Sequence, residues 1–171
     1  MPLYTILPKA NKMSNPALFT TLDRAVEAAL PRGIAELAEL VAVPSVAAKP
    51  DSPMTECAEK VAELFRTRGF TSYLVPTNGG PPVVYAEDRT AGVDAPTVLF
   101  YNHYDVQPAE PFDLWDSNPF TLRVDGDYAV ARGASDDKGH IICRLMAIDA
   151  LKAANGGTLP VNIKVVVEGE E

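Results

Sequence analysis

The chain has 171 residues, of which 47% are hydrophobic and 22% are charged, which suits one globular domain with a hydrophobic core. Its formal net charge of -8 argues against nucleic acid and anionic membranes as partners, because both attract basic proteins. We find no apolar run of the about 20 residues that a membrane span requires, and the first residues lack the apolar core and cleavage site of a signal peptide. Cys57 and Cys143 belong to no CxxC pair, so we expect two small buried thiols in a reduced, cytoplasmic protein.

The N-terminal part of the chain is expected to begin with a flexible extension over residues 1–16. Residues 17–42 carry apolar side chains at helical spacing, but Pro31 and Gly33 interrupt the pattern, so it predicts either two helices or one broken helix. A second helical pattern covers residues 54–69. It ends at a glycine, the residue type that commonly follows a helix in the left-handed conformation.

The middle of the chain changes from helical to strand periodicity. Residues 70–75 and 83–86 are predicted strands on either side of a turn rich in glycine and proline at residues 78–82. Residues 96–103 are apolar almost throughout. Such a continuous run is typical of a strand that is buried on both faces.

The last third of the chain continues the alternation of helices and strands. Residues 107–120 form a proline-rich loop, and residues 121–124 and 128–131 are expected to pair as a hairpin. A helix over residues 139–154 precedes a buried strand over residues 161–167. Helices that alternate with buried strands predict an α/β fold in which a mostly parallel sheet is flanked by helices.

Three groups of polar residues lie after strands or in the loops beyond them, the region where open α/β sheets bind ligands. The first group is His103-Tyr104-Asp105, at the end of the apolar strand. A histidine that binds a metal usually donates its second ring N–H to a carboxylate, and Asp105 is either that partner or itself a ligand. The alternative is a structural histidine paired with a nearby acid, which the motif alone does not exclude.

The second group is the segment Gly-Ala-Ser-Asp-Asp-Lys-Gly at residues 133–139, before the last helix. Acidic residues at a helix N-terminus are favoured by the helix dipole, so helix capping is one interpretation of Asp136 and Asp137. The flanking glycines allow the backbone to approach a ligand closely. The sequence lacks the P-loop pattern, which excludes that type of nucleotide site.

The third group is Glu168-Gly169-Glu170-Glu171, directly after the last strand. A solvated acidic turn is the simplest interpretation. If this strand runs parallel to the strand that ends at His103, however, both polar groups lie at the same end of the sheet. One histidine and several carboxylates then provide nitrogen and oxygen ligands, which suit zinc, manganese or a similar divalent ion.

The three groups in this order resemble the co-catalytic zinc peptidase family of carnosinase-like dipeptidases, aminoacylases, acetylornithine deacetylase, succinyl-diaminopimelate desuccinylase and glutamate carboxypeptidase. The dipeptidase branch is the most similar. The resemblance is carried by the segments VLFYNHYDVQP, LWDSNPF, ARGASDDKG and LPVNIKVVVEGEE. It implies that residues 17–171 are the N-terminal part of a zinc-peptidase-like catalytic domain, without its C-terminal part and without the lid or dimerisation domain.

The resemblance also implies a role for each motif residue. His103 is expected to bind one metal ion, with Asp105 orienting its imidazole. Asp136 is expected to bridge two divalent metal ions, with Asp137 as a less critical neighbour. Zinc is the expected metal, and manganese and cobalt are the alternatives.

The position of the general base depends on how the family's Glu-Gly-x-Glu-Glu motif is aligned. Aligned on the motif itself, the base is Glu171 and the metal ligand is the next residue, which this chain lacks. Counted by the family's usual separation from Asp136, the base is Glu170 and Glu171 is the metal ligand. We favour the first alignment, because insertions collect in loops such as residues 155–157.

The implied activity is hydrolysis of a dipeptide amide bond by a metal-activated water. The alternative is an N-acyl amino acid deacylase of the same family, so the expected substrate is a small peptide or an N-acyl amino acid. The resemblance further implies that the full-length protein is a homodimer. The isolated 171-residue chain is expected to be inactive, and a non-catalytic fragment is the third hypothesis for it.

Overall fold

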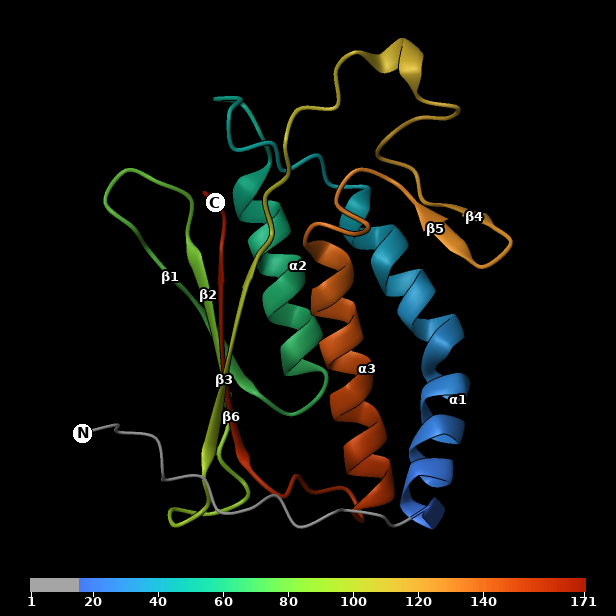
Figure 1. Cartoon of the computed structure of the whole chain (residues 1–171). Helices are drawn as coiled ribbons and strands as arrows, with labels where there is room; N and C mark the ends of the chain where they lie inside the picture. Colours follow the sequence, from blue (N-terminus) through green and yellow to red (C-terminus); the bar gives the residue numbers. More distant parts are fainter. Residues whose placement is uncertain (1–15) are drawn as a thin grey trace, which may run out of the picture.

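The computed structural model describes residues 16–171, and Figure 1 shows the path of the chain. Of the predicted extension over residues 1–16, only Pro16 lies within the described residues, and it begins the first helix. The helices and strands are, in chain order, α1 (Pro16–Val41), α2 (Met54–Arg66), β1 (Thr71–Val75), β2 (Val83–Asp88), β3 (Thr97–His103), the short 3₁₀ helix η1 (Phe112–Leu114), β4 (Arg123–Asp125), β5 (Tyr128–Val130), α3 (Lys138–Ala154) and β6 (Asn162–Glu168).

The main sheet has four strands in the order β1-β2-β6-β3, and β4 and β5 form a separate hairpin. β1 pairs with β2 and β2 pairs with β6 in antiparallel orientation, whereas β3 and β6 are parallel. The prediction of a mostly parallel sheet is therefore wrong. A short turn such as that between β1 and β2 joins antiparallel neighbours, while a parallel pair needs a crossover of the kind that α3 provides between β3 and β6.

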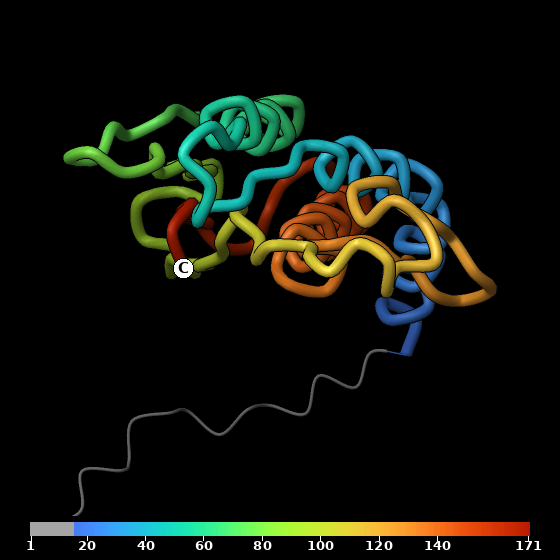
Figure 2. Tube along the Cα trace, turned by 90° about the horizontal axis from the view of Figure 1, so that it is seen from above, coloured from blue at the N-terminus to red at the C-terminus, as the bar shows by residue number. Residues whose placement is uncertain are grey.

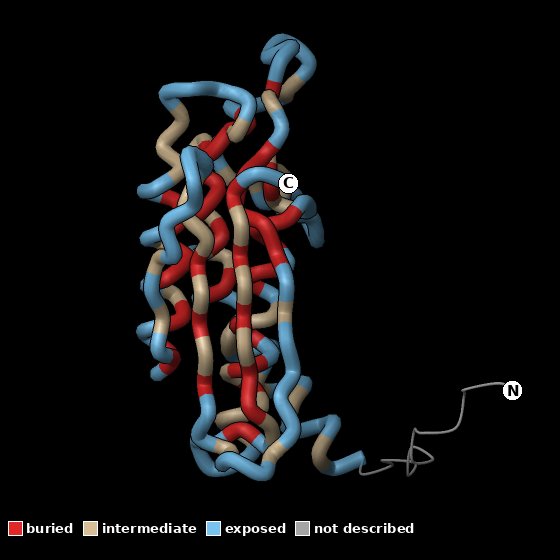
Figure 3. Tube along the Cα trace, turned by 90° about the vertical axis from the view of Figure 1, so that its left-hand side faces the viewer, coloured by how far each residue is buried: buried red, intermediate tan, exposed pale blue. Residues whose placement is uncertain are grey.

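One face of the main sheet is covered by helices, and no helix or strand of the described residues covers the other face. α1, α2 and α3 all lie on the same side of the sheet (Figures 1 and 2). On the opposite side, Tyr73, Leu99 and Tyr101 are at least half exposed, and Figure 3 looks onto this face. The prediction that residues 96–103 are buried on both faces is wrong within the described part of the chain. An apolar run indicates that a strand needs cover, but it does not say which segment provides it.

α1 is one continuous helix of 26 residues, although Pro31 lies inside it. A proline removes a backbone hydrogen bond and disfavours a helix interior, but α1 packs lengthwise against α3 (Figure 1). A Cβ atom at Gly33 would clash with Met146 of α3. The predicted break is absent, and Gly33 serves instead to let the two helices approach closely.

The end of α2 confirms the role predicted for its glycine. Gly69 has a φ of 85°, the left-handed conformation that glycine adopts without strain. The amide N–H groups of Gly69 and Phe70 donate to the carbonyls of Arg66 (2.9 Å) and Phe65 (3.2 Å). This pair of bonds is the Schellman arrangement, which satisfies carbonyls left free at a helix end.

The hydrophobic core lies between the sheet and the helix layer. Cys57 is part of this core, whereas Cys143 is exposed, so the prediction of a buried thiol is right for the first cysteine and wrong for the second. Within residues 16–171, no helix combines the length and the apolar character needed to cross a membrane. The largest apolar side chains that are almost fully buried are Leu40, Val41, Val61, Phe65, Val84, Tyr104, Ile141, Leu145, Ile148, Val165 and Val167.

Candidate metal centre

The rim of the sheet at the carboxyl ends of β3 and β6 gathers two of the three polar groups. Because these two strands are parallel, His103 and Glu168 are register partners at their ends. The Tyr104 amide continues this pairing by donating to the Glu168 carbonyl (2.8 Å). The segment before α3 reaches this rim as well, because Asp136 and Asp137 both lie within hydrogen-bond distance of His103.

His103 lies between two carboxylates. Its Nδ1 atom is 3.2 Å from an Asp105 oxygen, and its Nε2 atom is 3.0 Å from an Asp136 oxygen. The Asp105 side chain is buried, with 3% exposed, whereas the Asp136 side chain is 78% exposed. One carboxylate therefore holds the imidazole from the protein interior, and the other faces its outer nitrogen from the solvent side.

The surroundings of His103 raise its pKa above the ordinary value. Burial lowers this pKa, but the hydrogen bond with Asp136 and the negative charges of Asp105 and Asp137 raise it by more. The imidazole therefore keeps its proton to a higher pH than a free histidine does. A cation at Nε2 competes with that proton, because histidine binds metals in its neutral form.

Asp137 makes several contacts in this region, although the resemblance implied only a less critical neighbour of Asp136. One of its carboxylate oxygens accepts from the Asn102 side-chain amide (2.5 Å) and from the His103 backbone N–H (3.1 Å). The other oxygen lies 2.6 Å from Nδ1 of His140. Asp137 thus joins the end of β3 to the start of α3 and places Asp136 opposite His103. The signal that could have indicated this was Asn102, a polar residue within an otherwise apolar strand.

Tyr104, which lies between His103 and Asp105 in the sequence, is anchored in the core next to the rim. Its side chain is fully buried, and its hydroxyl donates to the Pro82 carbonyl in the β1–β2 turn (2.7 Å). Burial raises the pKa of this hydroxyl. A Cβ atom at Gly169 would clash with the Tyr104 ring, so the glycine of the acidic segment is needed for this close approach.

The three glutamates of the acidic segment make different contacts at this end of the sheet. The Glu171 amide lies 3.4 Å from the Asp105 oxygen that faces His103. The Glu170 carboxylate lies beside Gly80 of the β1–β2 turn. Glu168 accepts a hydrogen bond from the Tyr101 hydroxyl, and this bond is the main cause that raises the pKa of Tyr101 to about 12. Of the two candidates for the base, Glu171 is the one whose backbone adjoins Asp105.

The donor set fits a divalent metal ion in part. His103 and Asp136 offer an imidazole nitrogen and a carboxylate oxygen, which suit zinc, and Asp105 lies behind His103 as a carboxylate does behind most metal-bound histidines. Among residues 16–171, no three histidine, cysteine or acidic side chains lie close enough together to hold one ion. The described residues therefore bring together two donors rather than a complete ligand set.

A family model described as peptidase family M20/M25/M40 matches residues 99–171. The matched region includes all three polar groups of the candidate centre. The chain belongs to this peptidase family.

Curated relatives of this M20 chain are named as dipeptidases. The Cys-Gly metallodipeptidase DUG1 of Candida albicans is 34% identical over 161 residues, which are 85% of this chain and 33% of that protein. The Beta-Ala-His dipeptidase of Homo sapiens is 45% identical over 95 residues, which are 53% of this chain and 18% of that protein. The M20 chain thus spans a third or less of the length of these relatives.

Solved structures of M20 dipeptidases have the same arrangement of helices and strands. The di-peptidase Dug1p from Saccharomyces cerevisiae superposes with a TM-score of 0.80 at 29% identity, over 89% of this chain and 34% of that one. Human carnosine dipeptidase 1 superposes with a TM-score of 0.77 at 31% identity, over 90% and 35% of the two chains. The mixed α/β fold described above is therefore one that M20 dipeptidases share.

Proposed function

We propose that this M20 chain supplies one side of the metal centre of a hydrolase that cleaves dipeptide amide bonds. The observation that carries the proposal is His103, whose ring nitrogens face the carboxylates of Asp105 and Asp136 at the end of a parallel strand pair. The names of the relatives, which are Cys-Gly and β-Ala-His dipeptidases, support the substrate class.

The residues of the proposed centre have different roles. His103 and Asp136 would hold the metal, and zinc is proposed, with manganese and cobalt as alternatives. When bound, divalent ions lower the pKa of water and polarise the scissile carbonyl. Asp105 fixes the imidazole so that Nε2 faces Asp136, which keeps the metal-binding nitrogen directed outward.

Glu171 is the proposed general base, with Glu170 as the alternative. Its backbone adjoins Asp105, so Glu171 lies at the rim where the metal would bind. The carboxylate takes a proton from the attacking water and delivers it to the leaving amine. Such general acid–base steps typically contribute about 10²- to 10⁴-fold to the rate.

The remaining metal ligands are proposed to come from outside these 171 residues. Support comes from the two-donor set of the described residues and from relatives that are about three times as long as the matched region. On this proposal, the isolated chain does not turn over substrate. The cytoplasm as its location and a homodimer for the full-length protein are further proposals.

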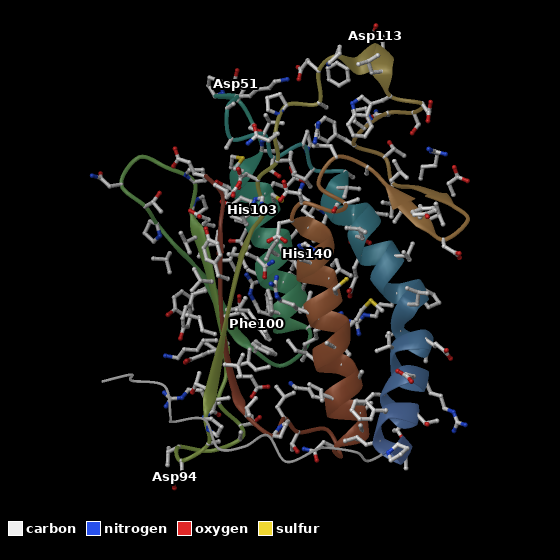
Figure 4. The ribbon with its side chains drawn as sticks, viewed as in Figure 1. Asp51, Asp94, Phe100, His103, Asp113 and His140 are labelled. Carbon is white, nitrogen blue, oxygen red and sulfur yellow. The ribbon has the colours of Figure 1, made fainter. Side chains whose placement is uncertain are left out.

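Metal titration of the purified chain tests the binding half of the proposal. We expect one weak site for Zn²⁺ or Co²⁺, measured by calorimetry or by visible absorption. His103→Ala and Asp136→Asn should each weaken it at least about tenfold. Asp94→Asn is the matched control, because Asp94 is an acid at the opposite end of the sheet (Figure 4). Binding that survives His103→Ala would contradict the site.

A fusion protein tests the catalytic half. The chain replaces the corresponding third of the S. cerevisiae Dug1p dipeptidase, whose structure it matches. We expect hydrolysis of Cys-Gly or β-Ala-His that a chelator abolishes and Zn²⁺ or Mn²⁺ restores, and no hydrolysis by the 171-residue chain alone. Cleavage of N-acetyl amino acids in preference to dipeptides would favour the deacylase alternative. Chelator-resistant hydrolysis, or activity that survives His103→Ala, would refute the mechanism.

A further inference from the structure

A buried ammonium group lies directly behind the candidate metal centre. Lys138, the first residue of α3, is fully buried. Its Nζ atom donates to the backbone carbonyls of Leu40 (2.9 Å) and Val43 (2.7 Å). Burying a charge is costly unless its hydrogen bonds are satisfied. In Lys138, main-chain oxygens at the end of another helix accept two hydrogen bonds, and the Cys57 side chain is a further partner.

The position of these carbonyls indicates what offsets the cost of burying a cation there. Leu40 is in the last turn of α1, and Val43 follows the end of this helix. The last carbonyls of a helix have no partners within the helix and carry partial negative charge, which favours a cation. Lys138 therefore attaches the turn that carries Asp136 and Asp137 to the carboxyl end of α1.

The same segment after α1 also holds the strand end that carries His103. The buried Ser45 hydroxyl donates to the Tyr104 carbonyl (2.7 Å), and the Ser45 carbonyl accepts from the Val106 amide (2.8 Å). Through Val43 and Ser45, Lys138 is thus connected by buried hydrogen bonds to the residues on both sides of Asp105.

The turn before α3 is shaped around the lysine stem. A Cβ atom at Gly133, where φ is 83°, would lie 3.3 Å from Cδ of Lys138 and 2.7 Å from Val106. A Cβ atom at Gly139 would clash with the Ala134 carbonyl. Gly133 is therefore explained by its positive φ and by packing against Val106 and the Lys138 stem, and Gly139 by the close approach of the Ala134 carbonyl, without any ligand contact.

We propose that Lys138 is a positioning residue of the metal centre: its ammonium group, through Val43 and Ser45, fixes the turn so that Asp136 faces His103. Lys138 itself contacts neither metal nor substrate. The inference deepens the proposed function and rests on it, because it assigns a role toward the same His103–Asp136 pair.

Two lysine variants and one control lysine test this role. Lys138→Met keeps the stem and removes the charge, and Lys138→Arg keeps a cation with several donors. Lys152→Met is the matched control, because Lys152 lies on the same helix and its Nζ atom also donates to a carbonyl, that of Arg68 (2.8 Å), but near the other end of α3. Each variant is titrated with Co²⁺ after its folded fraction has been measured by circular dichroism.

We expect Lys138→Met to weaken Co²⁺ binding by the folded protein about 10- to 100-fold, the usual effect of losing a residue that supports a metal ligand. Lys138→Arg should restore part of the affinity, and Lys152→Met should change it less than about threefold. Wild-type affinity in folded Lys138→Met, or an equal loss in Lys152→Met, overturns the proposal. If Lys138→Met does not fold, Ser45→Ala decides, because it breaks the same connection: weaker binding supports the proposal and unchanged binding overturns it.

A metal-free measurement separates this inference from the proposed function. The chain has two histidines, so the His103 ring signals are readily assigned by NMR. We expect a nuclear Overhauser contact between the His103 ring and the Asp136 methylene in wild type and Lys152→Met, and its loss in Lys138→Met. If wild type binds no metal, the proposed function fails, and this contact still decides whether Lys138 positions Asp136. If the contact persists in Lys138→Met, the positioning role fails alone.

Discussion

The two sides of the candidate metal centre are anchored to the fold in different ways. On the side of β3 and α3, Asp137 accepts two hydrogen bonds from β3 and faces His140, and Lys138 holds the turn from inside the core. On the side of β6, Gly169 packs against Tyr104, and beyond it the chain contacts the rim through the 3.4 Å bond from the Glu171 amide to Asp105. Preorganised geometry is therefore concentrated on the histidine side, and we expect the acidic side to contribute little to stability.

The largest effect on stability is expected when the contacts of Asp137 are removed. Asp137→Ala leaves the Asn102 amide and the His103 backbone N–H without their acceptor, and both belong to buried residues. Each unsatisfied buried donor costs about 1–3 kcal/mol, so we expect the free energy of unfolding to fall by about 2–4 kcal/mol in urea denaturation. Asp136→Ala is the control. The Asp136 side chain is exposed, and its removal should cost less than about 1 kcal/mol. Equal losses in the two variants would contradict the anchoring role of Asp137.

The next largest effect on stability is expected at Gly169, where the acidic segment is tightly packed. Gly169→Ala places a methyl group against the buried Tyr104 ring, and such overpacking typically costs about 1–3 kcal/mol. The cost should be smaller in a Tyr104→Leu background, which removes the ring, and a double-mutant cycle in urea measures the difference. An equal cost in both backgrounds would show that the ring is not the cause.

The His103 titration sharpens the comparison without large changes in stability. In the metal-free chain, we expect an NMR midpoint above the ordinary value of about 6.5, and Asp136→Asn should lower it by removing the hydrogen bond that raises the pKa. A raised pKa means that the folded state binds this proton more tightly than the unfolded state. The resulting stabilisation is present below about pH 6.5 and is lost as the pH rises through the folded-state pKa. A midpoint that is unchanged by Asp136→Asn would contradict the pairing.

The smallest effect on stability is expected at the acidic residues themselves. Glu170 and Glu171 are exposed, so Glu170→Gln and Glu171→Gln should each change the free energy of unfolding by less than about 0.5 kcal/mol. In the dipeptidase fusion, however, Glu171→Gln should reduce kcat about 10²- to 10⁴-fold, as expected for a general base. A large loss with Glu170→Gln and a small one with Glu171→Gln would exchange their roles.

The sequence predicts the positions of the helices and strands well where the pattern is local. The Gly69 helix end and the turn between β1 and β2 follow from residue types and spacing. The parallel orientation of β3 and β6, which was only a condition for the predicted shared site, is present in the structure. The predictions fail where the structure depends on which distant elements pack against a helix or strand. The open face of β3 and the continuity of α1 through Pro31 depend on which elements pack together, which periodicity does not encode.

The candidate site divides in the same way. The amino-acid sequence by itself determined which residues are candidates for metal chemistry, because imidazole and carboxylate groups after strand ends are visible in the order of the residues. Only the tertiary structure decided how they are held. The bonds of Lys138 to Leu40 and Val43 and those of Asp137 to Asn102 join residues 35 to 98 positions apart. Contacts at such separations depend on how the helix layer packs on the sheet, and no local pattern specifies that packing.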